Sequence, residues 1–202
     1  VVDIGGGSTE LVWIDLSNVP NIERPRAIMR LHSGFRADPG AFEAAKVVDW
    51  ISVPLGVATL RDQFADVDDD AARFALMSWF FEESLEAFAP SNAAQVREGF
   101  QIIGTSGTVT TVAASHLGLR RYDRTKVDGL QMTSDQIDAV IRDYLSLGPT
   151  GRRNDPRIGK DRQALIMSGA AILQALMRLW PTDRLSVADR GLREGLLYQQ
   201  MS

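Results

Sequence analysis

The stretch "VVDIGGGSTELVWID" (residues 1–15) joins two short apolar runs through a turn rich in glycines and hydroxyls. The apolar run before Gly5 predicts one strand, and the alternation in "TELVWID" predicts a second, so the stretch indicates a β-hairpin. Glycine lets a ligand approach the main chain closely, and bare amides can point at the oxygens of an anion. The turn is therefore either a phosphate and metal site or only the tight end of a hairpin.

The residues beside the glycines favour the first interpretation. Asp3 is a hard oxygen ligand suited to Mg²⁺, which a phosphate would bring with it. Glu10 stands one step beyond the turn, where it can orient water or bind the metal; a plain surface carboxylate is the alternative. Phosphate binding is assigned to the turn residues Gly5, Gly6, Gly7, Ser8 and Thr9. The turn is not a dinucleotide fingerprint, which would need glycine in place of Glu10, nor a P-loop, which would need Gly-Lys-Ser/Thr.

Composition sets the class of protein. The 202 residues, 45% apolar and 24% charged, are typical of a soluble globular domain, alone or with an insertion. The absence of cysteine excludes disulfides and thiolate metal sites and fits a reducing compartment, which predicts a cytoplasmic location. No apolar run approaches the roughly 20 residues of a membrane span, so no membrane partner is expected. The formal net charge of −4 argues against binding to DNA or RNA.

The charge is unevenly distributed along the chain. Many of the arginines lie in "LRRYDRTK" (residues 119–126) and "GRRNDPRIGKDR" (residues 151–162). Such segments are usually solvated faces. The alternative is that some of these arginines face a polyanion, whose approach they would steer.

The remaining patterns predict an α/β layer protein. Strands are expected at residues 27–34 and 47–56, with an insertion or long loop over about 17–46. An apolar stripe predicts a helix over Asp69–Ala89, and "TSDQIDAVIRDYLSL" predicts another with a Thr or Ser cap. A mobile, basic link should follow at 148–159. The segment "RQALIMSGAAILQALMRLW" is apolar nearly all round and predicts a buried helix, followed by a short strand and a final helix.

A second stretch, "FQIIGTSGT" (residues 100–108), repeats the pattern of the first: an apolar strand runs into a turn of glycines and hydroxyls. The helix expected after it would present its amino end, which favours an anion, to that turn. Three Asp- or Gly-rich stretches, at 3–10, 104–108 and 189–195, each follow an apolar strand. Ligands of open α/β sheets gather at such strand ends.

The motifs "DIGGGSTEL", "SVPLGVATL", "GTSGTVTTVAA" with "YDR" and "VDG", and "VADRGLREGLL" resemble the exopolyphosphatase and guanosine pentaphosphate phosphatase family. This family belongs to the actin, Hsp70 and sugar-kinase superfamily, and the resemblance runs from residue 1 to the end, broken only at 17–46. It implies a ribonuclease-H-like lobe, with a mixed sheet and helices on both faces. The chain would be the second of two such lobes. The missing N-terminal lobe would carry the first phosphate loop and the glutamate that activates the attacking water.

The resemblance also implies site residues. The second glycine loop, which would face the phosphate chain or the nucleotide end, matches Gly104, Thr105, Ser106, Gly107 and Thr108. Arg162 lies where the family places an arginine, and a phosphate contact is weighed against a plain surface arginine. The chain departs from the family at Ala164, where an aspartate is common. Asp189, Arg193 and Glu194 match the terminal motif and are expected to cap and brace the last helix.

The implied function is Mg²⁺-dependent hydrolysis of terminal phosphoanhydride bonds in polyphosphate or guanosine pentaphosphate, with release of orthophosphate. This chain would supply half of the site, with Glu10 as its own catalytic candidate and the general base outside it, so the isolated fragment should turn over negligibly. One alternative is an ATP-dependent kinase of the same superfamily, against which the "LREG" ending argues. Another is a non-catalytic lobe that senses polyphosphate or an alarmone. The oligomeric state stays open, with a homodimer as one candidate.

Overall fold

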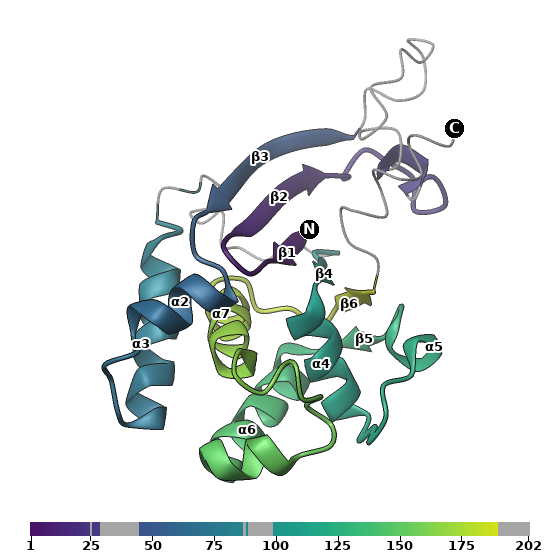
Figure 1. Cartoon of the computed structure of the whole chain (residues 1–202). Helices are drawn as coiled ribbons and strands as arrows, with labels where there is room; N and C mark the ends of the chain where they lie inside the picture. The colour runs from purple at the N-terminus through teal and green to yellow at the C-terminus, as the bar shows by residue number, and fades with distance from the viewer. Residues whose placement is uncertain (25, 29–44, 87, 89–98, 190–202) are drawn as a thin grey trace, which may run out of the picture.

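The computed structural model describes residues 1–24, 26–28, 45–86, 88 and 99–189. They contain a mixed sheet with the strand order β3-β2-β1-β4-β6-β5 (Figure 1). Its strands are β1 (Val2–Ile4), β2 (Thr9–Asp15), β3 (Lys46–Val53), β4 (Ile102–Thr105), β5 (Gln131–Met132) and β6 (Leu185–Ala188). The central strands β1, β4 and β6 run parallel, whereas β2, β3 and β5 are antiparallel to their neighbours. The predicted hairpin and the mixed sheet are both confirmed.

The three parallel strands end at the same edge of the sheet. Asp3 is in register with Thr105 of β4, and Thr105 is in register with Ala188 of β6. The turn after β1, the turn after β4 and Asp189 after β6 therefore follow one another along this edge. The sequence predicts such a grouping, and the structure confirms it for the parts of the three stretches that it describes.

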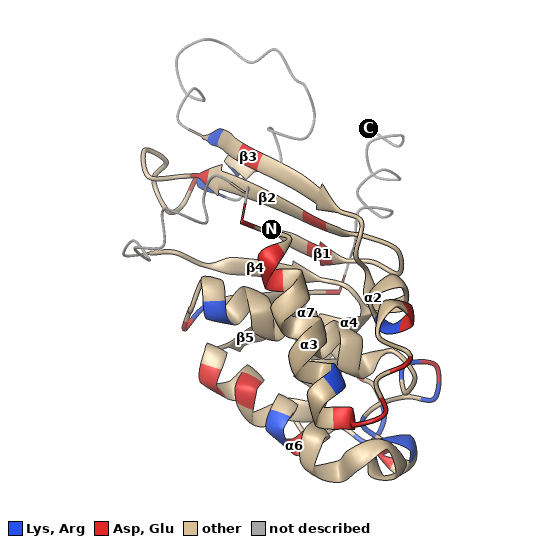
Figure 2. Cartoon of the chain, turned by 90° about the vertical axis from the view of Figure 1, so that its left-hand side faces the viewer, with Lys and Arg blue, Asp and Glu red and all other residues tan. Residues whose placement is uncertain are grey.

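The long helices gather on one side of the sheet in both views (Figures 1 and 2). They are α2 (Val57–Gln63), α3 (Asp70–Glu83), α4 (Gly107–His116), α6 (Ser134–Asn154) and α7 (Ile166–Leu179), while the short α5 (Arg124–Val127) lies near β5. The sequence predicts helices on both faces. The expected final helix falls within residues 190–202, outside the described part of the chain.

The core lies between the sheet and these helices. Val2, Ile4 and Leu11 are buried, because side chains alternate along a strand and these positions face the helices. Helix α7 is buried nearly all round, as its sequence predicts, with Ala171, Ile172 and others fully enclosed. Even so, no helix in the described ranges is long and apolar enough to cross a membrane.

Two predicted elements differ in the structure. Helix α3 begins at its Asp69 cap as expected but ends at Glu83, because the Ser84 hydroxyl donates to the Phe81 carbonyl at 2.5 Å and the next amides turn to carbonyls three residues back. The strand expected at 27–34 begins in helical backbone instead, since the amide of Ala27 donates to the Glu23 carbonyl. Residues 29–34 lie outside the described ranges.

The basic link expected at 148–159 is helical through Asn154. Gly148 takes a left-handed conformation (φ 61°, ψ 177°), and Pro149 starts a second helical segment, so α6 is kinked rather than ended there. Arg152 on this segment is buried and donates to both carboxylate oxygens of Asp70, at 2.6 and 2.8 Å. The segment is therefore pinned to α3 and is part of the packed helical layer.

Candidate functional site

Helix α2 holds the turn after β1 through two backbone hydrogen bonds. The amides of Val57 and Ala58 donate to the carbonyls of Gly5 and Gly6, each at 2.9 Å. A Cβ on Gly56 would lie 2.5 Å from backbone atoms of those two glycines, so only glycine allows this contact. The carbonyl side of the turn is thus fixed by the first turn of α2, which no local sequence pattern predicts.

Two glycines of this turn, Gly6 and Gly7, are not explained by packing or by backbone conformation, whereas a Cβ on Gly5 would lie 2.9 Å from the Ser8 carbonyl oxygen. Neither Gly6 nor Gly7 has a positive φ, and a Cβ on either would meet no atom of the described residues within 4 Å. Both are exposed. Because neither strain nor crowding within the described chain demands glycine there, the bare backbone is available for close approach by another group.

Not every residue of the turn can serve a phosphate. The Gly5 amide already donates to the Ser8 carbonyl at 2.8 Å, within the hairpin. Thr9 is fully buried, and its hydroxyl donates to the Leu55 carbonyl at 2.8 Å, which leaves its side chain less available to a phosphate than the prediction assumes. The exposed Gly6 and Gly7 and the partly exposed Ser8 remain as candidates.

Two carboxylates lie side by side on the two strands that this turn connects. Asp3 and Glu10 are register partners on β1 and β2. Because side chains alternate along a strand and Val2, Ile4 and Leu11 face the helices, the two carboxylates lie on the other face of the sheet. Glu10 is oriented by two hydroxyls: its Oε1 accepts from Ser8 at 2.5 Å and from Ser52 at 3.0 Å. Within the described part of the chain, no donor reaches the Asp3 carboxylate. Like charges directly opposite each other repel, so this pair suits a bound cation.

The residues present fit Mg²⁺. Magnesium is usually held by one or two carboxylates and the oxygens of a phosphate, with water in the other positions. Asp3 and Glu10 can supply the carboxylates, although the described residues contain no cluster of three or more acidic or histidine ligands. Such a site therefore needs a phosphate ligand to complete it.

The turn after β4 is strained and leads directly into α4. Ser106 has φ 126° and ψ 165°, a conformation that a residue with a side chain rarely adopts. The hydroxyl of Thr110 donates to its carbonyl at 3.0 Å, and the Thr111 hydroxyl donates to the Gly107 carbonyl at 2.6 Å. These bonds hold the turn in place. Strain of this kind is concentrated at functional sites.

A cation lies over the amino end of α4. A Cβ on Gly107 would lie 2.1 Å from the guanidinium carbon of Arg162, so the guanidinium rests against the glycine backbone. Arg162 is exposed, and no carboxylate of the described residues pairs with it. A helix amino end already carries a partial positive charge. Two positive groups placed together without a counter-ion favour an anion at this position.

Other residues of the second turn have structural roles. Gly104 faces the Val109 side chain, where a Cβ would approach to 3.1 Å. The Thr108 side chain is buried against Gly169 of α7, so within this loop it packs against a helix. The Thr105 hydroxyl is buried without a hydrogen-bond partner in the described structure. Ser106, Gly107 and Arg162 thus form the part of this region that is open to a ligand.

Asp189, at the end of β6, is paired with a neighbouring loop. Its carboxylate lies 2.9 Å from Nε of Arg124, and its amide donates to Asp128 at 3.0 Å. Burial, followed by a hydrogen bond to Asp189, raises the pKa of Tyr122 to about 12. Asp189 was expected to cap the final helix with Arg193 and Glu194; these two lie outside the described residues.

The arginine-rich segments are only partly available to an anion. Arg152 forms an ion pair with Asp70, and Arg157 forms ion pairs with Asp143 and Asp155, so these two are not among the arginines left to face a polyanion. Arg162, from the same segment, is the exception. Sequence reasoning missed Gly56 and Ser52 because their contacts join residues more than forty positions apart, and no local pattern marks such contacts.

The profile of the Ppx/GppA phosphatase family matches residues 1–202. This chain belongs to the Ppx/GppA phosphatase family. Among curated relatives, it is 26% identical over 198 residues to the guanosine-5'-triphosphate,3'-diphosphate pyrophosphatase of Aeromonas salmonicida, covering 98% of this chain and 33% of that protein. The chain spans 50% and 33% of the length of two curated relatives that it matches.

Solved structures of Ppx/GppA proteins share the fold. The type II crystal structure of the Aquifex aeolicus Ppx/GppA phosphatase superposes with a TM-score of 0.70 at 27% identity, covering 100% of this chain and 56% of that one. An exopolyphosphatase-like protein gives a TM-score of 0.72 at 26% identity, covering 99% of this chain and 59% of that one. The resemblance of the sequence motifs to this family is confirmed.

Proposed function

We propose that this chain forms one wall of the active site of a phosphoanhydride hydrolase. The enzyme would release orthophosphate from the end of inorganic polyphosphate or guanosine pentaphosphate. The observation that carries the proposal is the meeting of two anion-facing turns at one sheet edge, beside the Asp3 and Glu10 carboxylates. The relatives named above support the reaction class, since they include a guanosine pentaphosphate hydrolase and an exopolyphosphatase-like protein.

Each group has a distinct role in this proposal. The amides of Gly6 and Gly7 hold oxygens of the terminal phosphoryl group, while Arg162 and the amino end of α4 hold the next phosphates along the chain. Asp3 and Glu10 would hold Mg²⁺, which neutralises charge on the phosphoryl oxygens when bound. The free oxygen of Glu10 also lies where it can orient a water. Positioning and charge neutralisation are most of what phosphoryl transfer requires.

The base that takes the proton of the attacking water belongs, in this proposal, to a second lobe outside these residues. Water attacks the terminal phosphorus, the bond to the bridging oxygen breaks, and the shortened polyphosphate leaves with that oxygen. A general base contributes typically about 10²–10⁴-fold. The 202-residue chain alone is accordingly expected to bind phosphate groups but to turn over negligibly.

Orthophosphate release by the complete protein tests this function. Long-chain polyphosphate and guanosine pentaphosphate are supplied separately, with Mg²⁺ and then with excess chelator. The proposal predicts Mg²⁺-dependent release from at least one of the two. Tight binding of either compound without release would instead make the protein a sensor, and transfer of phosphate from ATP to an acceptor would make it a kinase.

A further inference from the structure

Arg162 lies on the segment between α6 and α7, outside the turns at the sheet edge. Its side chain is exposed and forms no ion pair with a described residue. Its backbone is held locally, with its amide donating to the Gly159 carbonyl and its own carbonyl accepting from Leu165 and Ile166, all at 2.9 Å. The backbone of Arg162 is thus held on one side by the amino end of α7, and on the other side by the segment 155–161 that leads to it from α6.

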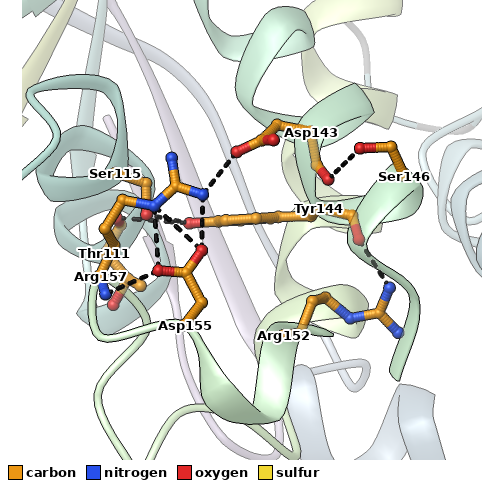
Figure 3. Close-up of polar contacts among 8 residues, drawn as sticks. All are labelled: Thr111, Ser115, Asp143, Tyr144, Ser146, Arg152, Asp155 and Arg157. Carbon is orange, nitrogen blue, oxygen red and sulfur yellow. Dashed lines mark hydrogen bonds and ion pairs between the residues drawn. The ribbon is translucent and has the colours of Figure 1, made fainter. Parts of the chain in front are cut away.

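Two side chains connect this turn to α6. Gln163, next to Arg162, donates to the Arg153 carbonyl at 2.7 Å, and Arg157 makes the larger set of contacts. Arg157 donates through Nη2 to Asp143 at 2.6 Å and to Asp155 at 2.5 Å, and through Nε to both oxygens of Asp155 at 3.0 and 2.9 Å (Figure 3). Its backbone amide also donates to Asp155, at 2.9 Å. The fork geometry of the guanidinium joins the end of α6, through Asp155, to the body of α6, through Asp143.

The same network reaches α4. Tyr144, next to Asp143, is fully buried, and its hydroxyl donates to the Ser115 hydroxyl of α4 at 2.6 Å (Figure 3). Burial raises the pKa of Tyr144 to about 12, so this donor stays neutral in ordinary buffers. A continuous connection therefore runs from α4 through Tyr144 and its neighbour Asp143 to Arg157. From Arg157, five peptide units lead past Ile158 to Arg162.

Arg157 is not the only arginine that holds this region. Arg152 ties α6 to α3 through Asp70 and also donates to the Tyr144 carbonyl at 2.8 Å; its side chain is 6% exposed. Of the two partners of Arg157, Asp143 is 41% exposed and its ion pair is a weak source of stability, whereas Asp155 is 6% exposed and its ion pair is the stronger one. Besides this stability, the contacts of Arg157 hold the start of the segment 155–162 against the body of α6.

We propose that Arg157 is a positioning residue that aims Arg162 at the phosphates held by the amino end of α4. This inference rests on the proposed function, because it takes the anion at α4 to be a phosphate of the substrate. Arg157 itself, with its three N–H donors directed at carboxylates, does not touch the substrate. Its loss should weaken phosphate binding through Arg162, without changing the Mg²⁺ site at Asp3.

The test is the affinity of the complete protein for an imido-bridged analogue of tripolyphosphate, which resists hydrolysis, in the presence of Mg²⁺. Arg157→Gln is expected to weaken binding about tenfold, the effect of losing one charge-assisted contact. Arg153→Gln is the matched control, since it removes the same charge from an exposed side chain on the same helix end, and it should change affinity less than about twofold. Arg157→Lys should restore only part of the affinity, because an ammonium cannot form the fork.

Two further variants separate positioning from folding. Asp143→Asn weakens the clamp without leaving a buried charge and should give an intermediate loss of affinity. In Arg157→Gln/Arg162→Gln the loss should equal that of Arg162→Gln alone, because both changes remove the same contact. Additive losses, or equal affinities of Arg157→Gln and Arg153→Gln, overturn the positioning role. If the wild-type protein fails to bind the analogue, the proposed function itself fails; if it binds and Arg157→Gln has no effect, only this inference fails.

Discussion

Asp3 of β1 and Glu10 of β2 face each other as direct register partners, one on either side of the turn that joins their strands. A folded protein gains nothing in stability from two carboxylates in this position, because like charges opposite each other on a sheet repel. Glu10 is nevertheless held in place by two hydroxyls. The arrangement is explained if a cation is part of the working site.

Replacing one of the two carboxylates should therefore stabilise the metal-free protein. Asp3→Asn is expected to raise the free energy of unfolding by about 0.5 kcal/mol in chelator, since it removes the repulsion. Added Mg²⁺ should stabilise the wild-type protein and not the variant. Urea unfolding of the complete protein with and without Mg²⁺ measures both effects. Equal Mg²⁺ stabilisation of the two proteins would place the metal elsewhere.

Gly56 should be intolerant of a side chain. Gly56→Ala places a methyl group 2.5 Å from backbone atoms of Gly5 and Gly6, neither of which can move without disturbing the hairpin. A loss of about 1–3 kcal/mol in unfolding free energy is expected, as for other overpacked sites. Gly159→Ala is the control, because a Cβ there meets no described atom within 4 Å. Similar unfolding midpoints for the two variants would contradict the close packing of α2 against the turn.

Gly107 should behave differently. Gly107→Ala places a methyl group against the end of a flexible side chain, Arg162, which can swing away. The unfolding free energy is expected to change by less than about 0.5 kcal/mol. The affinity for the imido-bridged phosphate analogue should fall as far as in Arg162→Gln, because the guanidinium is displaced from α4. Unchanged affinity in a folded Gly107→Ala protein would show that Arg162 does not act from this position.

Stability should also depend on pH through Tyr144. Burial raises the pKa of its hydroxyl from 10.0 to about 12, so its contribution is complete below the unfolded value and is lost as the pH rises toward the folded one. Tyr144→Phe should cost about 1 kcal/mol at neutral pH, where the bond to Ser115 is lost. The difference from wild type should shrink above about pH 10 in urea titrations. A constant difference would mean that the hydroxyl titrates normally.

Local sequence patterns predicted the sheet edge well. The alternation in residues 9–15 and the apolar runs before Gly5 and Ser106 are short-range signals, and strand ends follow from them. The amino-terminal caps of α3 and α6 could also be predicted from neighbouring residues. In α3, for example, the Ala72 amide donates to the carboxylate of Asp69, three residues before it. The carboxyl-terminal end of α3 was predicted less accurately, because a helix boundary depends on turn geometry that helix propensity does not specify.

The roles of single side chains could not be predicted in the same way. Ser8 and Thr9 are neighbours with hydroxyl side chains, yet the buried Thr9 hydroxyl donates to the Leu55 carbonyl, whereas the Ser8 hydroxyl donates to the Glu10 carboxylate. Arg152 and Arg162 come from one basic segment, yet one is buried in an ion pair and the other lies over α4. These differences are set by contacts between residues that are distant in sequence, which no spacing within a segment specifies.

The most direct test of the account is orthophosphate release by the complete protein, with Mg²⁺ and polyphosphate or guanosine pentaphosphate, in the Asp3→Asn variant. Asp183→Asn is the matched control, because Asp183 is exposed and precedes β6, at the opposite end of that strand from Asp189. The account predicts a fall of at least about 100-fold for Asp3→Asn and none for Asp183→Asn. Undiminished release from a folded Asp3→Asn protein would contradict the assignment of this sheet edge as the metal and phosphate site.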